Sequence, residues 1–276
     1  MSQTTYLSTG NVRIDRVEGD GMAVNSYVVH GPGGLVVVDA QLTVADAHKV
    51  RETVRASGLA LAGVLVTHPH PDHYAGAAII ASGGEPIMAT AGVAAVIRRD
   101  DALKDGIVGA MMGAQWPSQR RLPDTLVESG STVELGGLSF SVRETGPGES
   151  DMDSLWTLDD RTVFAGDVAY HDAHAYLADG NIESWRTTLD DLAGALDSSA
   201  TLYVGHGAPV GPTVLREQRR YLDAFVQAVI ESNDLDVAQR EAEVVRRMRP
   251  LAQDERLLFL MQLSIEPVHA ALAAGG

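Results

Sequence analysis

The sequence predicts an α/β protein in which two β-sheets pack face to face and helices cover their outer sides. Two features of the chain lead to this fold class. Short β-branched and aromatic runs alternate with segments whose apolar residues recur at helical spacing, and this strand–helix pattern appears twice. After Gly211 the pattern is helical throughout. Stacked layers accommodate this order, because each element must bury an apolar face against another.

The first half of the chain is expected to supply one sheet and the helices that cover it. Alternating and short apolar runs place strands at residues 11–17, 23–29, 35–39, 61–66 and 86–88. Helical spacing places helices at residues 44–56, 74–81 and 91–99. Residues 104–124 carry Met111, Met112 and Trp116 among glycines and prolines. This composition predicts an irregular segment, either a mobile flap or pocket wall or an ordinary packed loop.

The second half is expected to form the other sheet and a helical tail. Strands are expected at residues 131–134, 138–142, 154–158, 162–165 and 201–204, and helices at 183–196, 214–230, 237–248 and 255–273. We therefore expect residues 1–212 to form the main domain and residues 213–276 to form a helical extension packed on it. Three roles stay open for this extension: it covers a functional site, it forms the surface of a homodimer, or it only packs on the sheets.

Composition and charge narrow the classes of function. The chain has no cysteine, which excludes disulfides, thiolate metal sites and a cysteine nucleophile. Its formal net charge is −16 and Lys49 and Lys104 are its only lysines, so a nucleic acid is not expected as a partner. No apolar run approaches the roughly 20 residues of a membrane span, and no membrane association is expected. The N-terminal residues show no secretory signal, which predicts a cytoplasmic location.

The segment Thr67-His-Pro-His-Pro-Asp-His73 follows a buried strand and is typical of a metal site. His68, His70 and Asp72 are two residues apart, so an extended backbone directs them to the same side. Pro69 and Pro71 favour that extended geometry in the residues before them. His73 follows where the chain turns toward a helix and can approach from another angle. Imidazoles and a carboxylate suit Zn²⁺, iron or manganese.

This segment resembles the HxHxDH signature of the metallo-β-lactamase superfamily. Three further positions fit the family's order of motifs: Asp39 closes an early strand, Asp167 follows Phe164-Ala-Gly, and His206 follows Val204-Gly. The resemblance covers about residues 20–210. It implies an αβ/βα sandwich with the metals at one edge of the two sheets, and residues 1–212 would then be the catalytic domain.

One position departs from the family pattern. Glu149, in the turn Gly146-Pro-Gly-Glu, occupies the place where the third motif normally supplies a histidine. Three interpretations follow. Glu149 binds the metal as a carboxylate, or Asp151 or Asp153 reaches into the site instead, or the site holds a single ion. We favour the first, because the turn presents residue 149 as it would present the histidine. A carboxylate there shifts the preference somewhat from Zn²⁺ toward iron or manganese.

The resemblance also implies a reaction. His68, His70 and Glu149 would hold one ion, Asp72, His73 and His206 would hold another, and Asp167 would bridge them, giving one or two Zn²⁺ ions with iron or manganese as alternatives. A metal-bound hydroxide would then cleave an ester, lactone, thioester or amide bond of a small molecule. Asp72 would orient the water or carry its proton, and Tyr170 or His171 would donate a hydrogen bond to the developing oxyanion.

Other functions occur on the same fold. An iron-dependent oxidoreductase of the persulfide dioxygenase type is the main alternative to the hydrolase. True β-lactamase activity is disfavoured by the missing secretory signal and by Glu149. Nucleic-acid processing is disfavoured by the acidic charge, and a non-catalytic binding protein by the nearly complete set of ligands.

Overall fold

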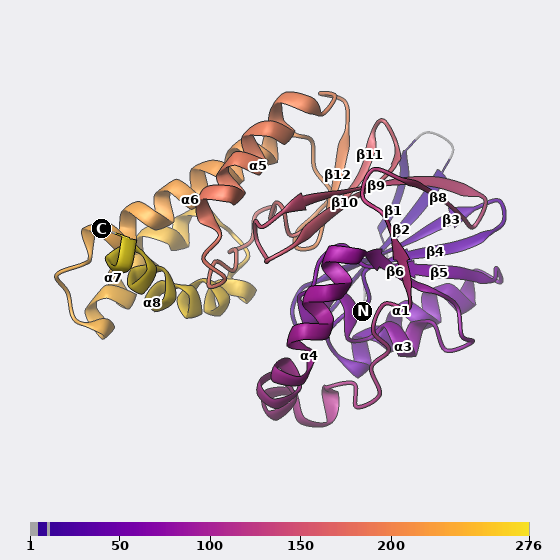
Figure 1. The fold of residues 1–276 in the computed structure, drawn as a ribbon, viewed down its shortest axis with the longest axis horizontal. Helices are drawn as coiled ribbons and strands as arrows, with labels where there is room; N and C mark the ends of the chain where they lie inside the picture. Colours follow the sequence, from indigo (N-terminus) through magenta and orange to yellow (C-terminus); the bar gives the residue numbers. More distant parts are fainter. Residues whose placement is uncertain (1–4, 10–11, 276) are drawn as a thin grey trace.

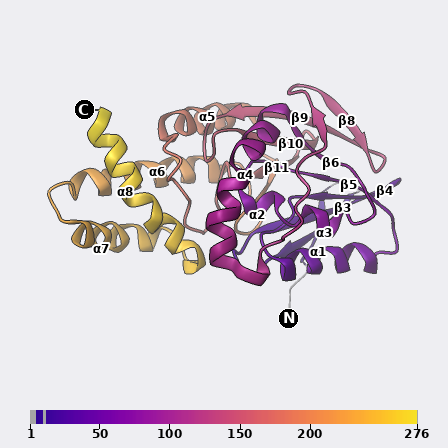
Figure 2. The same cartoon turned by 60° about the horizontal axis from the view of Figure 1, so that its bottom comes forward.

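The computed structural model describes residues 5–9 and 12–275, without the side chains of residues 5–9 and 275. Two sheets face each other and helices lie on both outer sides (Figures 1 and 2). Two expectations fall partly on other residues. The expected absence of a secretory signal involves residues 1–4 and 10, and the expected strand at 11–17 begins at residue 11. These residues lie outside the described part of the chain.

The first sheet has seven strands in sequence order, antiparallel from β1 to β4 and parallel from β4 to β7. Its strands are β1 (Thr5–Thr9), β2 (Val12–Glu18), β3 (Asn25–Gly31), β4 (Gly34–Val38), β5 (Leu61–Leu65), β6 (Ile87–Thr90) and β7 (Thr125–Val127). The helices of this half are α1 (Val44–Ala56), α2 (Pro71–Tyr74), α3 (Ala77–Ile80) and α4 (Ala91–Met112).

The second sheet has five strands in the order β12-β11-β10-β9-β8. These are β8 (Thr132–Leu135), β9 (Leu138–Gly146), β10 (Asp153–Asp159), β11 (Thr162–Gly166) and β12 (Thr201–Val204). Within this second sheet, as far as the structure describes it, β11 and β12 form a parallel pair and the other neighbouring strands are antiparallel. The helices of this half are α5 (Ile182–Ala195), α6 (Thr213–Glu231), α7 (Val237–Met248) and α8 (Leu258–Gly275).

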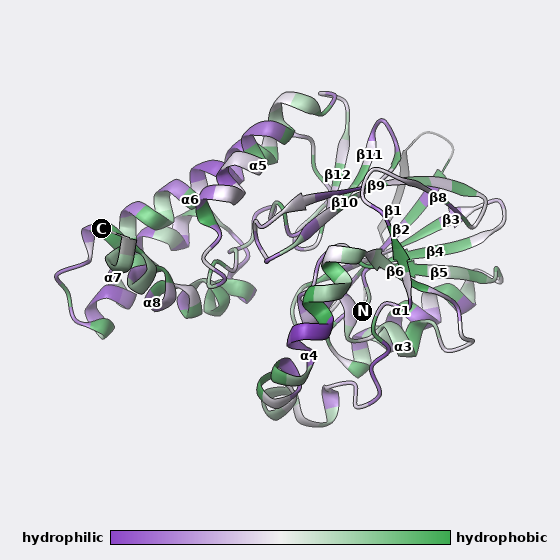
Figure 3. Cartoon of the chain, viewed as in Figure 1, coloured by the Kyte–Doolittle hydropathy of each residue, from purple (hydrophilic) through white to green (hydrophobic). Residues whose placement is uncertain are grey.

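The core is divided by the sheets into layers, which confirms the predicted fold class. On β4, Val36 and Val38 point between the sheets toward Phe164, whereas Leu35 and Val37 belong to the core under α1. This alternation follows from the two-residue period of a strand. Because both of its faces are buried, β4 is hydrophobic along its length (Figure 3). A third core joins the second sheet to α5–α8.

Two expectations for the first half are wrong. The helix expected at 74–81 is divided into α2 and α3 at Gly76, where a Cβ atom would lie 2.1 Å from the Ala40 carbonyl oxygen. Residues 104–112, expected to be irregular, continue helix α4, and strand β7 follows where none was expected. Two helix-interior glycines, which usually cost about 1 kcal/mol each, concealed this helix.

The expectation about apolar segments also needs correction. Residues Glu255–Ala274 form one segment that is long and apolar enough to cross a membrane by length and composition, and one third of its apolar window is buried. Isolated polar residues such as Gln262 and Ser264 interrupt its apolar run but leave its mean hydropathy high. In this fold, α8 packs against α6 and α7.

Candidate metal centre

The predicted site residues meet at one edge of the two sheets, in segments that follow the carboxyl ends of strands. His68 to His73 follow β5, Asp167 follows β11 and His206 follows β12. Such strand ends are where open α/β folds usually bind ligands. Seven residues come together there, and none of them is more than 8% exposed: His68, His70, Asp72, His73, Glu149, Asp167 and His206.

The local backbone agrees with the sequence in part. His70 is extended, with φ −74° and ψ 144°, as expected for a residue before proline. Pro71, however, is already the first residue of α2, so Asp72 and His73 lie on a helical turn. At residue 205 only glycine fits without a shift of its neighbours, because a Cβ atom there would lie 1.9 Å from Asp167 Oδ1.

His68, His70 and Glu149 form what we call the first metal position. Glu149 Oε2 lies 2.8 Å from His70 Nδ1 and 3.5 Å from His68 Nε2. The structure therefore places Glu149 where its carboxylate can share an ion with both imidazoles. Tyr170 Oη donates a hydrogen bond of 3.0 Å to the other oxygen, Glu149 Oε1.

The second metal position consists of Asp72, His73 and His206. Asp72 Oδ2 lies 3.3 Å from His206 Nε2 and 3.6 Å from His73 Nε2. Asp167 lies beside the same imidazoles, 3.2 Å from His206 Nε2 and 3.5 Å from His73 Nε2. Asp167 also groups with His68 and His73, so it connects the two positions.

Neighbouring groups fix the orientation of the imidazoles in the second position. Asp39 Oδ2 accepts a hydrogen bond of 2.9 Å from His73 Nδ1, and the Ala23 carbonyl oxygen accepts one of 3.3 Å from His206 Nδ1. In both rings the proton is held on Nδ1, so the lone pair of Nε2 faces the cluster.

His68 is oriented through a threonine. The Thr67 hydroxyl donates to Asp39 and therefore accepts from His68 Nδ1 at 3.1 Å. His68 Nε2 is then left with a lone pair toward Glu149. Asp39, which the sequence assigned to an early family motif, thus supports two ligands of this segment, His68 through Thr67 and His73 directly.

The donor set fits a divalent cation. His68 Nε2, His73 Nε2, His206 Nε2 and Asp167 Oδ1 are buried and make no hydrogen bond to any residue that the structure describes. Buried polar atoms are rarely left without a partner. Cations bound at the two positions by imidazole nitrogens and carboxylate oxygens would satisfy all four atoms.

The electrostatics of the cluster are those of a site prepared for cations. Burial raises the pKa of Glu149 to about 8. Burial lowers the pKa of His206, but Asp167 and Asp72 outweigh it and raise that pKa to about 10. For His68, burial and the neighbouring His73 keep the pKa well below its usual value. A bound cation would replace the protons that these carboxylates otherwise retain on the imidazoles.

The three residues predicted to act on substrate differ in their placement. Asp72 is part of the second position. Tyr170 is 4% exposed, and its ring stacks on His206 at 5.3 Å between centroids. The His171 imidazole is half-buried and donates from Nδ1 to the Ala208 carbonyl oxygen at 2.7 Å. This hydrogen bond connects the segment after β11 to the segment after β12.

The alternatives to Glu149 take other places. Asp153 is buried and accepts hydrogen bonds from the backbone N–H groups of Glu149 and Ser150, so it shapes the turn that presents Glu149. Asp151 lies at the surface and pairs with Arg99 at 2.7 Å.

The structure adds a residue that the sequence did not single out. Asp179 Oδ2 lies 3.1 Å from His70 Nε2, which leaves His70 Nδ1 to face Glu149. Burial acts to raise the pKa of Asp179, but the hydrogen bond and charge of His70, together with Lys104 and Tyr176, outweigh it and lower that pKa. The only signal in the sequence is an aspartate before Gly180, which is ordinary in a turn.

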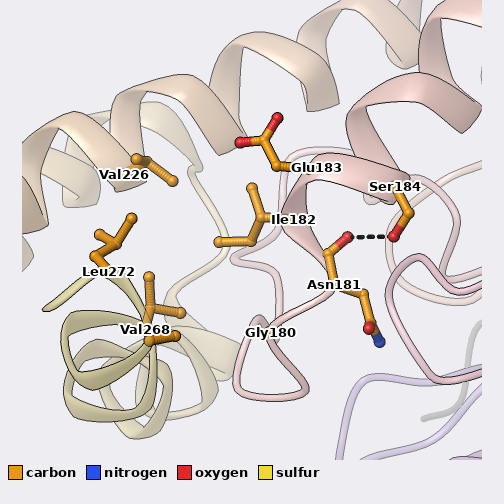
Figure 4. A pocket seen from close by; sticks show the side chains of 9 residues that line it. Gly180, Asn181, Ile182, Glu183, Ser184, Val226, Val268 and Leu272 are labelled. Atoms are coloured by element: carbon orange, nitrogen blue, oxygen red, sulfur yellow. Dashed lines mark hydrogen bonds between the residues drawn. The ribbon is translucent and has the colours of Figure 1, made fainter. Parts of the chain in front are cut away.

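The same loop borders a separate cavity of about 460 Å³ between the start of α5 and helices α6 and α8 (Figure 4). Its walls include Ile182, Val226, Val268 and Leu272. None of the seven clustered side chains lines it, so this cavity is not the metal centre.

Comparison with known proteins tests the family resemblance inferred from the sequence. Residues 19–206 match the profile of the metallo-beta-lactamase superfamily. The hydroxyacylglutathione hydrolase of Acidiphilium cryptum (strain JF-5) is 29% identical over 181 residues, 65% of this chain and 62% of that protein. The protein of the same name from Methylobacillus flagellatus is 26% identical over 180 residues, 65% of this chain and 60% of that protein. The chain thus spans about three fifths of the length of these relatives.

The fold comparison covers almost the whole chain. A metallo-beta-lactamase family protein from Thermus thermophilus aligns with a TM-score of 0.69 at 20% identity, over 95% of this chain and 94% of that chain. This likeness includes most of the C-terminal helices, because it leaves only 5% of the chain uncovered. The resemblance inferred from the sequence is confirmed, and the chain belongs to the metallo-beta-lactamase superfamily.

Proposed function

We propose that the protein is a hydrolase that depends on a divalent metal and cleaves an ester or thioester bond of a small molecule. The observation that carries this proposal is the convergence of two complete ligand sets in one buried cluster. The two relatives named hydroxyacylglutathione hydrolase favour a thioester among the possible bonds.

The residues of the cluster divide the chemical work. His68, His70 and Glu149 would hold one ion, and Asp72, His73 and His206 the other, with Asp167 between them. A bound ion of this kind lowers the pKa of water and polarises a carbonyl oxygen. The second carboxylate oxygen of Asp72 is available to hold or accept a proton at the mouth of the site.

Tyr170 is the best-placed side chain to contact a substrate oxygen. Its hydroxyl lies beside Glu149 at the first metal position, and its ring is fixed against His206. A rigid phenol is suited to donate a hydrogen bond to a developing oxyanion. His171 is the weaker candidate, because its half-buried imidazole is held to the Ala208 carbonyl oxygen and belongs to neither metal position.

We further propose Zn²⁺ as the resident ion, in two copies. Four imidazoles favour zinc, and the carboxylates of Asp72, Glu149 and Asp167 also suit iron or manganese. The domain boundary expected at residue 212 stays a proposal, and the core that α5 shares with α6–α8 supports the expected packing of the helical extension on the same domain. The cytoplasmic location and the homodimer stay predictions.

Metal analysis and a substrate screen test this function together. Protein purified without added metal would be assayed by elemental analysis, then with p-nitrophenyl acetate, S-lactoylglutathione and nitrocefin, before and after chelation. We expect close to two zinc ions per chain and thioester or ester cleavage that disappears with the metal and returns with Zn²⁺. Asp167→Asn is the matched inactive control.

Two outcomes would contradict the proposal. A protein without metal and without activity, but with an unchanged fold, would remove the metal-dependent function. Iron together with oxygen consumption, and no hydrolysis, would favour the oxidoreductase alternative.

A further inference from the structure

The distal half of α4 extends beyond the sheets (Figures 1 and 2). Its buried residues, Val93, Ala94 and Ile97, all lie in the first two turns. Figure 3 shows apolar residues again toward its far end. The apolar residues in this half of the helix are therefore not explained by packing in the core.

One face of this distal half is firmly attached. Asp101 accepts hydrogen bonds from Tyr74 and Arg120, at 2.9 Å each, and Asp105 accepts one of 2.7 Å from Trp116 Nε1. Val108 packs in the same small cluster as Trp116. The distal half is thus held in place by its side chains and is not a loose end.

The adjacent face carries large apolar side chains in solvent. Leu103, Ile107 and Met111 are 63%, 53% and 68% exposed. At 100° per residue they lie within an arc of about 80°, and they extend along about 12 Å of the helix. A contiguous exposed apolar stripe usually marks a binding surface.

This stripe lies on the side of α4 that borders the first metal position. Arg99, one helical turn before Leu103, contacts Asp151 at 2.7 Å, and Asp151 is two residues from Glu149. Asn181 joins Asp151 to the loop of Asp179, which holds His70. The stripe therefore begins where the wall around Glu149 and His70 ends.

The charges beside the stripe indicate what it binds. Asp100 lies on the same face, and Asp151 and Asp179 border its start, whereas the one lysine on this face is Lys104. Arg99 pairs with Asp100 and Asp151, so Arg99 and Lys104 together with the three carboxylates leave a small net negative charge. An anionic chain would be repelled by this surface, and a neutral aliphatic chain would not.

We propose that Leu103, Ile107 and Met111 bind the neutral aliphatic acyl group of the substrate, so that the enzyme prefers medium-length acyl esters or thioesters over acetyl ones. This inference rests on the proposed hydrolase function. It assigns the helix a role in substrate specificity, with the carbonyl of the acyl group at the first metal position.

The test compares two p-nitrophenyl esters and one set of variants. Leu103→Ser, Ile107→Ser and Met111→Ser are combined, and Leu263→Ser on α8, where leucine is 58% exposed, is the matched control. We expect kcat/KM for p-nitrophenyl octanoate to fall at least tenfold in the triple variant, mostly through KM. Cleavage of p-nitrophenyl acetate, metal content and the control variant should change less than twofold.

Other outcomes overturn the proposal. Equal losses on both esters, or no loss on octanoate, would show that the stripe does not bind the acyl chain. A wild-type dimer that becomes a monomer in the triple variant, by light scattering, would make the stripe a self-association surface.

If wild-type protein cleaves neither ester, the hydrolase proposal fails for esters. Binding of octyl 4-nitrophenyl ether, measured by calorimetry, then tests the stripe separately. Binding to wild type but not to the triple variant supports the stripe, and equal binding or no binding contradicts it.

Discussion

The two metal positions are built from the same kinds of donor but are held in different ways. In the second position, His73 is oriented by Asp39, whose side chain is 3% exposed, and His206 by the backbone carbonyl of Ala23. In the first position, His70 is oriented by Asp179, whose side chain is 26% exposed. The second position is thus fixed from inside the fold, and the first partly from its rim.

This difference follows from where the supporting residues lie in the chain. Asp39 and Ala23 belong to the first sheet and its connections, so the second position is tied to the core that makes the fold. Glu149 and Asp179 lie on the connections β9–β10 and β11–α5, beside α4. We infer that the second position contributes more to metal retention, whereas the first is where substrate preference can vary.

The largest expected effect comes from removing the carboxylate of the first position. Glu149→Ala deletes the donor that faces both His68 and His70. We expect elemental analysis to find about one ion fewer per chain and hydrolysis to fall more than the 10–100-fold that the loss of an outer partner usually causes. Glu149→Gln, of the same size, is the control for packing. Unchanged metal stoichiometry in Glu149→Ala would rule out Glu149 as a ligand.

The corresponding change at the second position is Asp39→Asn. Asparagine tolerates the positive φ of 62° at residue 39, so the fold should survive. Its amide can no longer accept from both Thr67 and His73, and the proton on His73 Nδ1 loses its partner. We expect a 10–100-fold weaker affinity for one ion, measured by competition with a chelating dye. An affinity within twofold of wild type would mean that packing alone orients His73.

Much of this centre could be predicted from the sequence, and for a physical reason. Metal ligation needs particular side chains at particular spacing, and His68 to His73 combine both with two prolines that restrict the backbone. Asp167 and His206 were found because each ends a short apolar strand in the order that the family uses. All of these residues meet in the structure.

The supporting residues were harder to find, because their role depends on contacts across the fold. Asp179 is one turn aspartate among many, and only the folded chain places it 3.1 Å from His70. Helix α4 was underestimated for a related reason. Gly106 and Gly109 indicate a loop by composition, but Asp101 and Asp105 are fixed by Arg120 and Trp116 from beyond the helix.

A smaller effect is expected at the rim of the first position. Asp179→Asn keeps the shape of the side chain but removes the charge beside His70 Nε2. Because this carboxylate is partly exposed, water can replace it in part, and we expect about a tenfold loss of affinity for one ion, the lower end of the usual range. Asp100→Asn removes a nearby charge without touching His70 and should leave affinity unchanged. Equal losses in the two variants would point to a general effect of charge.

The smallest expected effect is on the stability of the fold and comes from changing Asp46, close to the segment that supports the second position. Asp46 accepts hydrogen bonds from the backbone of Asp20 and Gly21, just before Ala23. Burial acts to raise the pKa of Asp46, but its hydrogen bonds, from Lys49 first, outweigh this and lower the pKa. The charged carboxylate therefore stabilises the fold above its ordinary pKa, and this contribution is lost as the pH falls below that value through the lowered one.

Thermal unfolding followed by circular dichroism measures this contribution. At pH 7 we expect Asp46→Asn to lower the stability by about 1 kcal/mol and Tm by about 2–4 °C. Below pH 4 the difference from wild type should shrink, because Asp46 then becomes protonated first in the unfolded chain and, at lower pH, in the folded protein. The exposed residue Asp160, changed to asparagine, should alter Tm by less than 1 °C, on the order of a neutral surface substitution. A constant difference between pH 3 and pH 7 would mean that Asp46 stabilises this corner by its shape and not by its charge.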